Sequence, residues 1–84
     1  MKFNPATTFL DYLEHSYRYY ILDDPIINDV EYDCMCKYLL ENYNIAVKSH
    51  PWHKVCKVTK SVLRAGSGYS IRYPKLLIDS MFTK

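Results

Sequence analysis

Apolar residues recur at three- and four-residue spacing in two successive stretches of the first half of the chain. This spacing places them on one face of a helix, and the first stretch predicts a helix over about residues 5–21. Asn4 followed by Pro5 is a favourable opening, because Asn accepts from free amide groups and proline at the first helical position loses no hydrogen bond. The apolar positions of this helix are Leu10, Leu13, Tyr17 and Ile21.

A second helix is expected over about residues 29–43. Asn28 can accept from the amide of Glu31 while Glu31 reaches back, which is the pattern of a capping box. Between the helices, Asp23-Asp24-Pro25 must end the first one, since proline lacks an amide and restricts the residue before it. A short connection favours an antiparallel helical hairpin. The apolar stripe of the second helix is Tyr32, Met35, Cys36, Leu39 and Tyr43.

The second half of the chain has weaker periodicity. A short helix is predicted over residues 59–66, a turn over 66–68, a brief strand over 69–73 where apolar and polar residues alternate, and a last short helix from Pro74 to Met81. Trp52 is expected to pack on the hairpin. The fold class is therefore mainly α, a helical hairpin followed by a small irregular part with short helices and a short strand.

With 84 residues the chain is expected to form a single domain, 1–84, with a modest core. Its apolar runs are too short to cross a bilayer, and its start has no apolar signal segment. Three cysteines without a framework spacing favour free thiols in a reducing compartment. These features indicate a soluble, cytoplasmic protein that does not enter a membrane.

Charge divides the chain into two unlike halves. Residues 1–47, which contain the hairpin, hold three Lys and Arg against eight Asp and Glu, a net of −5, while the extension 48–84 holds eight against one, a net of +7. This split predicts one of two outcomes: the halves attract one another, or the second half presents a basic face to phosphate-rich partners. A nucleic-acid surface would use Lys57, Lys60, Arg64 and Arg72. The alternative is a solvated basic surface.

A zinc site is a weak alternative use of the cysteines and histidines. Thiolate and imidazole groups suit tetrahedral zinc, and five such residues occur in the chain. Their spacing matches none of the usual finger patterns, so packed or idle side chains are the expected outcome and no metal is assigned. The residues are Cys34, Cys36, His50, His53 and Cys56.

Tyrosines and carboxylates gather on both sides of the hairpin turn. In an antiparallel hairpin the last turn of the first helix and the first turns of the second lie at the same end, so these side chains can form an aromatic cup with carboxylates at its rim. Such a cup suits a flat, cationic or polar ring with hydroxyl groups. The alternative is ordinary capping and packing. The five residues are Tyr19, Tyr20, Asp29, Tyr32 and Asp33.

Residues 19–33 resemble a segment of the N-terminal helical subdomain of bacterial NAD-dependent DNA ligases, of the form Tyr-(His/Tyr)-x-x-Asp-x-Pro-x-Ile-x-Asp-x-Glu-Tyr-Asp. The resemblance covers about residues 8–43, and a weaker similarity occurs at His50-Pro51. It implies that the subdomain binds the nicotinamide mononucleotide (NMN) half of NAD. Tyr19 and Tyr32 would hold the ring, Asp29 and Asp33 would contact ribose and carboxamide groups, and Tyr20 would lie near the phosphate.

The chain departs from this family in one decisive motif. The ligase nucleophile lies in Lys-x-Asp-Gly, and no lysine here is followed by Asp two positions later. We therefore expect a non-catalytic NMN- or NAD-binding module, a free-standing copy from a mobile or viral genome that acts with a separate adenylation domain or against a host ligase in DNA replication or repair. The alternatives are a small basic nucleic-acid-binding accessory protein and a protein–protein adaptor.

Overall fold

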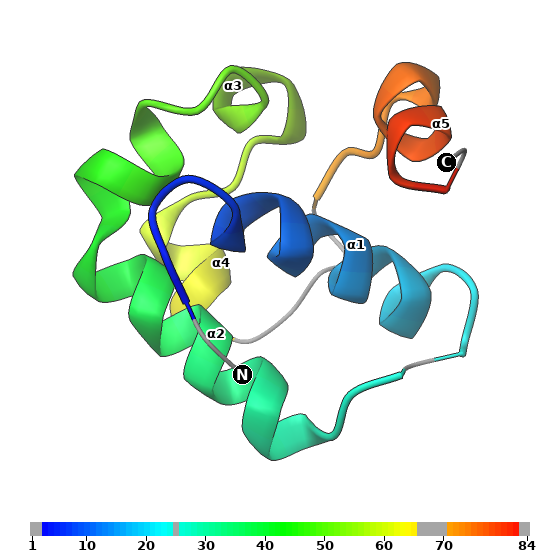
Figure 1. Cartoon of the computed structure of the whole chain (residues 1–84), viewed down its shortest axis with the longest axis horizontal. Coiled ribbons are helices and arrows are strands. Elements are labelled where there is room, and N and C mark those ends of the chain that lie inside the picture. Colours follow the sequence, from blue (N-terminus) through cyan, green and yellow to red (C-terminus); the bar gives the residue numbers. More distant parts are fainter. Residues whose placement is uncertain (1–2, 25, 66–70, 83–84) are drawn as a thin grey trace.

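The regular structure of the described chain is helical. The computed structural model describes residues 3–24, 26–65 and 71–82. Within these ranges the elements are α1 (Thr8–Tyr20), α2 (Asp29–Glu41), the π-helical turn η1 (Asn44–Lys48), α3 (His53–Cys56), α4 (Lys60–Ala65) and α5 (Lys75–Phe82). Figure 1 shows α1 and α2 running in opposite directions, with α4 behind them and α5 beside the second half of α1. The predicted mainly α fold with a helical hairpin is confirmed.

Asn4 caps the turn that leads into α1 and not the helix itself, because the helix begins three residues later than Pro5 and its N-cap residue, Thr7, makes no side-chain capping bond. The Asn4 side-chain oxygen accepts from the amides of Ala6 and Thr7, both at 2.9 Å, and residues 5–7 form a turn that leads into the helix. Of the predicted apolar face, Leu13 is fully buried. Leu10 and Tyr17 are half-buried, and Ile21 is exposed because it lies beyond the end of the helix.

The connection between α1 and α2 begins with a left-handed residue. Asp23 has φ 53°, a conformation that Asp tolerates better than most non-glycine residues. Just after it, the Asp24 amide donates to the carbonyl of Arg18 at 2.8 Å. The helix has already ended at Tyr20, and the chain turns at the Asp23-Asp24 pair that the sequence marks as a break.

The start of α2 matches its prediction. The Asn28 side chain accepts from the Glu31 amide at 2.8 Å and the helix starts at Asp29. Its central apolar stripe is buried, since Met35 and Leu39 are inaccessible to solvent and Cys36 is nearly so. The helix ends at Glu41, two residues before the predicted boundary.

One hydrophobic core joins the acidic and the basic halves of the chain. From the first half it takes side chains of α1 and α2, and from the second half it takes buried residues of α3, α4, α5 and their connections. Half-buried Trp52 packs against this core, in agreement with its predicted role. The Tyr43 hydroxyl donates to the Val58 carbonyl at 2.9 Å and ties the two halves together. The fully buried core side chains include Phe9, Tyr12, Leu13, Met35, Leu39, Val47, Cys56, Val58 and Leu77.

Three features of the second half differ from the sequence expectations. Residues 53–56 form the short helix α3 and residues 44–48 form η1, neither of which has a clear apolar period. Residues 71–73 have no regular structure, so the predicted strand is not found there, and 69–70 lie outside the described residues. The predicted turn over 66–68 also lies outside them. The helices expected near 59–66 and 74–81 are present as α4 and α5.

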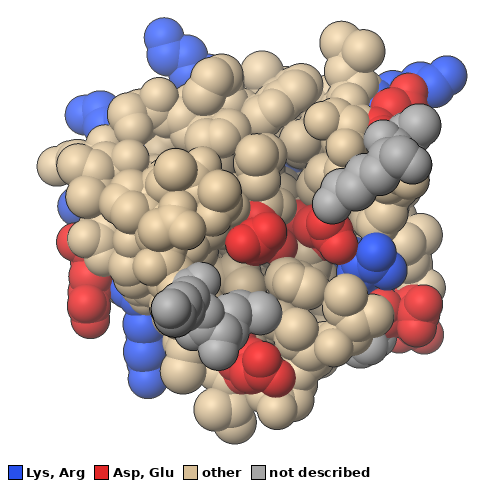
Figure 2. All heavy atoms as spheres, viewed as in Figure 1, with Lys and Arg blue, Asp and Glu red and all other residues tan. Residues whose placement is uncertain are grey.

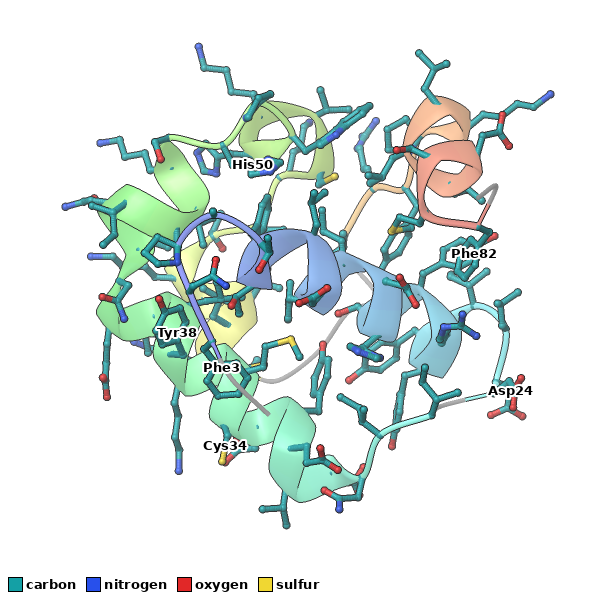
Figure 3. All side chains as sticks on the ribbon, viewed as in Figure 1. Phe3, Asp24, Cys34, Tyr38, His50 and Phe82 are labelled. Atoms are coloured by element: carbon teal, nitrogen blue, oxygen red, sulfur yellow. The ribbon has the colours of Figure 1, made fainter. Side chains whose placement is uncertain are left out.

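Aromatic contacts fix the outer elements on the hairpin. The Phe3 and Tyr38 ring centroids are 5.4 Å apart, and Figure 3 shows the two side chains next to each other. On α5, the Phe82 ring contacts Tyr17 at 5.6 Å and receives the Arg18 guanidinium at 4.9 Å. In the described parts of the chain, no helix is both long and apolar enough to span a membrane.

Candidate functional site

The five residues singled out around the hairpin turn line one hollow. Its volume is about 260 Å³, and it lies at the end of the hairpin near the turn marked by Asp24 in Figure 3. Two lining residues come from the last turn of α1 and three from the first turns of α2. The hairpin brings these turns together, and we call this the turn hollow. Its lining is Tyr19, Tyr20, Asp29, Tyr32 and Asp33.

Three tyrosine rings form a stack that leads from the core to the turn hollow. Buried Tyr12 and half-buried Tyr32 have ring centroids 5.7 Å apart with planes 21° apart. The Tyr19 ring lies 6.3 Å from the Tyr32 ring with planes 15° apart, and Tyr19 is 40% exposed. Of the three rings, Tyr19 is therefore the one that solvent reaches most. Tyr20 packs against Tyr19 at 4.8 Å.

A hydrogen bond to Ser16 on α1 holds the Tyr32 side chain in position. Its hydroxyl and the fully buried Ser16 hydroxyl are 2.7 Å apart, and either can donate. Burial raises the pKa of Tyr32, so the phenol remains neutral at physiological pH. The neighbouring Tyr12 hydroxyl is also buried but has no hydrogen-bond partner among the described residues, and burial raises its pKa. Tyr32, which lines the turn hollow, is thus neutral and held in position.

The rim of the turn hollow is acidic. Asp29 and Asp33 are exposed and lie one turn apart on α2. The Asp33 carboxylate is 3.3 Å from the Lys37 ammonium, but their side chains are 63% and 73% exposed, so the pair is weak and easily opened. Figure 2 shows further acidic side chains near the centre of the viewed face, while most Lys and Arg project from its edges.

The four basic residues predicted for nucleic-acid contact do not share one site. Lys57 and Arg72 line a second hollow together with Lys54. Lys60 lies over the Tyr43 ring at 5.5 Å, and it lines a different hollow at the end of α2. Arg64 is exposed on α4. The structure therefore joins Lys57 with Arg72 and separates them from the other two.

The cysteines occupy unlike environments. Cys34 is exposed on α2, as Figure 3 shows, whereas Cys36 and Cys56 are buried in the core. Burial raises the pKa of each buried thiol to about 11, so both remain protonated at neutral pH. Across residues 3–24, 26–65 and 71–82, no three His, Cys, Asp or Glu side chains approach closely enough to hold a metal ion.

Sequence reasoning missed the residues beneath the turn hollow. Tyr12 and Ser16 lie four residues apart on α1 and so share a face, and this face meets Tyr32. Their spacing can be seen in the sequence. However, Ser16 is polar and Tyr12 lies between the positions of the expected apolar stripe, so neither residue was selected. Lys54 belongs to the basic residues of the second half that are compatible with nucleic-acid binding, but only the fold brings α3 beside the segment before α5.

The fold is a small helical one with an open hollow lined by aromatic and acidic side chains. Known proteins with similar sequences are DNA ligases. The DNA ligase of Thermodesulfovibrio yellowstonii is 59% identical over 72 residues, which cover 82% of this chain and 10% of the relative. That of Petrotoga mobilis is 64% identical over 28 residues (33% of this chain, 4% of the relative), and that of Psychrobacter arcticus 54% over 35 residues (40% and 5%).

These matches relate the chain to a short part of DNA ligases, and they confirm its resemblance to the N-terminal region of the NAD-dependent enzymes. The chain spans between 4% and 10% of the length of the three ligases described above. No family model matches the chain. No solved structure matches it either.

Proposed function

We propose that this chain is a non-catalytic binding module that holds NMN, or the nicotinamide end of NAD, in the turn hollow. The observation that carries the proposal is that all five residues implied by the ligase resemblance line this one hollow. Ordinary packing of a hairpin requires only an apolar stripe and caps, and it does not require two exposed carboxylates beside an exposed tyrosine.

The lining suits an oxidised nicotinamide ring. That ring carries a positive charge, which the faces of tyrosine rings and nearby carboxylates both attract. Asp29 and Asp33 are exposed and able to accept hydrogen bonds from ribose hydroxyls and from a carboxamide group. The same surface offers less to a neutral adenine ring, so it favours the nicotinamide half of the dinucleotide.

The distance between the Tyr19 and Tyr32 rings limits how a nicotinamide ring can bind in the turn hollow. A ring held between two others needs about 7 Å between their centroids, since stacked carbons are separated by about 3.5 Å. Tyr19 and Tyr32 are 6.3 Å apart. A guest that stacks on Tyr32 must therefore displace Tyr19, which its exposed position on the last turn of α1 permits.

The turn hollow by itself covers only one side of a bound ligand. At about 260 Å³ it is smaller than typical ligand sites, which enclose about 300–1,000 Å³. We therefore expect weak binding by this chain alone, with a Kd on the order of 1 mM, and tighter binding when a second protein surface covers the ligand.

Nuclear magnetic resonance titration with NMN tests the proposal directly. We expect shifts of the Tyr19 and Tyr32 ring signals, and a loss of affinity of about tenfold in Asp33→Asn, because a hydrogen bond to a charged group is removed. Tyr19→Ala should also change the affinity, and both sites are exposed enough to preserve the fold. Asp79→Asn on α5 is the matched control, with the same charge change on another element.

Two results would contradict the nicotinamide proposal. One is the absence of any NMN-dependent shift in the unmodified chain. The other is an equal loss of affinity in Asp33→Asn and Asp79→Asn, which would show that the effect is not specific to the turn hollow.

The partner that covers the turn hollow is proposed to be a ligase adenylation domain. Next to the hollow, the turn and the start of α2 expose apolar side chains that the chain itself does not cover. Such a surface is typical of protein contacts. The exposed fractions are 53% for Ile21, 47% for Leu22, 60% for Ile26 and 71% for Val30.

Complementation tests the partner. A DNA ligase that lacks its own matching N-terminal segment should regain NAD-dependent formation of its lysine adenylate when this chain is added. Ile26→Ser with Val30→Ser should remove the effect, while Leu76→Ser, an equally exposed position on α5, should not. If the chain instead inhibits an intact ligase, it acts against a ligase. No effect in either assay would contradict the proposed partner.

A further inference from the structure

A second hollow lies between α3 and the segment before α5, and the nicotinamide proposal does not use it. Its volume is about 540 Å³, roughly the size range of sites for small ligands. Three of its six lining residues are cations and none is acidic. The residues are Lys54, Val55, Lys57, Arg72, Tyr73 and Pro74, and we call this the basic hollow.

The core holds the two sides of the basic hollow in place. Cys56 on one side and Ile71 on the other are both buried, and the Arg72 amide donates to the Cys56 carbonyl at 3.1 Å. Lys57 ends α3 in the left-handed region, with φ 56° and ψ 47°, and its amide donates to the His53 carbonyl at 3.0 Å. A non-glycine residue with positive φ is uncommon and unfavourable. Lys57 nevertheless has this conformation in the fold.

The cations of the basic hollow have no acidic partners in the described chain. The ion pairs found there join Arg18 to Glu14 and Lys37 to Asp33, which lie on α1 and α2. Lys54, Lys57 and Arg72 are exposed. Three uncompensated cations around one hollow attract an anion, and the guanidinium of Arg72 provides a planar fork that matches phosphate oxygens.

An aromatic and apolar wall completes the basic hollow. Tyr73 is half-buried and packs edge-to-face on Tyr17 with ring centroids 5.1 Å apart, so its ring is held in place. Pro74 and Val55 add apolar surface. A fixed aromatic ring beside cations is the combination on which bases stack while their phosphates pair with Lys and Arg.

We propose that the basic hollow binds the phosphate of a nucleotide through Arg72, Lys57 and Lys54, with the base or sugar against Tyr73 and Pro74. A free nucleotide and a single-stranded nucleic acid share this chemistry. The two hollows have no described lining residue in common, so a substitution in one leaves the lining of the other unchanged.

Fluorescence anisotropy with a labelled short oligothymidylate tests the basic hollow, with thymidine monophosphate as competitor. Lys57→Gln with Arg72→Gln should weaken binding about tenfold and lower the slope of log affinity against log salt by about 0.7, since the two cations share one phosphate and each phosphate contact on a single strand contributes about 0.7. Lys60→Gln with Arg64→Gln is the matched control, because it removes the same charge from exposed positions on α4. It should change affinity less than twofold.

The competitor distinguishes the two sources of phosphate. Displacement by thymidine monophosphate at concentrations similar to the oligonucleotide identifies a free nucleotide, whereas much tighter binding of the oligonucleotide identifies a strand. Lys54→Gln provides a second variant in which the loss should be smaller but in the same direction. Asp33→Asn should retain oligonucleotide binding even if NMN binding fails. Equal losses in the two double variants, or no binding of either probe at low salt, would overturn the proposal.

Discussion

Individual tyrosines of this chain have different roles that their identity alone does not reveal. Tyr12 and Tyr32 stack on each other, yet only the Tyr32 hydroxyl has a hydrogen-bond partner, Ser16, in the described structure. A buried polar group lowers stability when it is unpaired, whereas a buried hydrogen bond contributes about 1 kcal/mol in favour of the folded state. The two hydroxyls should therefore contribute to stability with opposite signs.

The same substitution at these two positions tests this difference. Tyr32→Phe should lower the free energy of unfolding by about 1 kcal/mol, because it removes the contact to buried Ser16. Tyr12→Phe should leave it unchanged or raise it by about 1 kcal/mol, because it removes an unpaired buried hydroxyl. Urea denaturation measures both values. Equal losses in the two variants would show that the Tyr12 hydroxyl is also paired.

At the scale of elements, the turn hollow depends on where α2 begins. The Asn28 cap sets the first residue of the helix, and this start places Asp29, Tyr32 and Asp33 on the side that faces α1. A later start would release Asp29 and its neighbours from the first turn, since residues before the start of a helix do not hold helical backbone angles. The cap therefore contributes both to stability and to the geometry of the site.

Removal of this cap has a measurable consequence. Asn28→Ala should lower the free energy of unfolding by about 1 kcal/mol, because the Glu31 amide loses its acceptor. It should also weaken NMN binding if α2 frays at its first turn. Asn44→Ala, an exposed asparagine outside α2, is the control and should change stability by less than about 0.5 kcal/mol in urea denaturation. A loss as large in the control would contradict the assigned cap.

For the whole molecule, the core sets the pH range of stability. Burial raises the pKa of Cys36 and Cys56 from 9.0 to about 11, so the folded state retains protons that the unfolded state loses above pH 9. Burial lowers the pKa of His15 and His50 below 6.5, so the unfolded state binds protons first as the pH falls below that value. Stability should be greatest between these two limits and decline on both sides.

Chemical denaturation across pH checks this window. Each buried thiol should cost about 2–3 kcal/mol of stability by the time the pH reaches 11. Cys56→Ala should reduce the decline above pH 9, and His15→Gln should reduce the decline below pH 6.5. The exposed Cys34→Ala is the control and should leave the profile unchanged. An unchanged alkaline decline in Cys56→Ala would place the titrating groups elsewhere.

The sequence by itself determined the local features of this protein: the hairpin, its caps, the break at Asp23-Asp24, and the five residues around the turn. These follow from spacing and backbone chemistry within a few turns of the chain. Only the tertiary structure decided which distant residues meet. It placed the Ser16 hydroxyl beside that of Tyr32, stacked Tyr12 and Tyr19 on Tyr32, and put Lys57 and Arg72 in one hollow that neither Lys60 nor Arg64 lines. Such contacts depend on how the helices share one core, and periodicity along the chain carries no information about that packing.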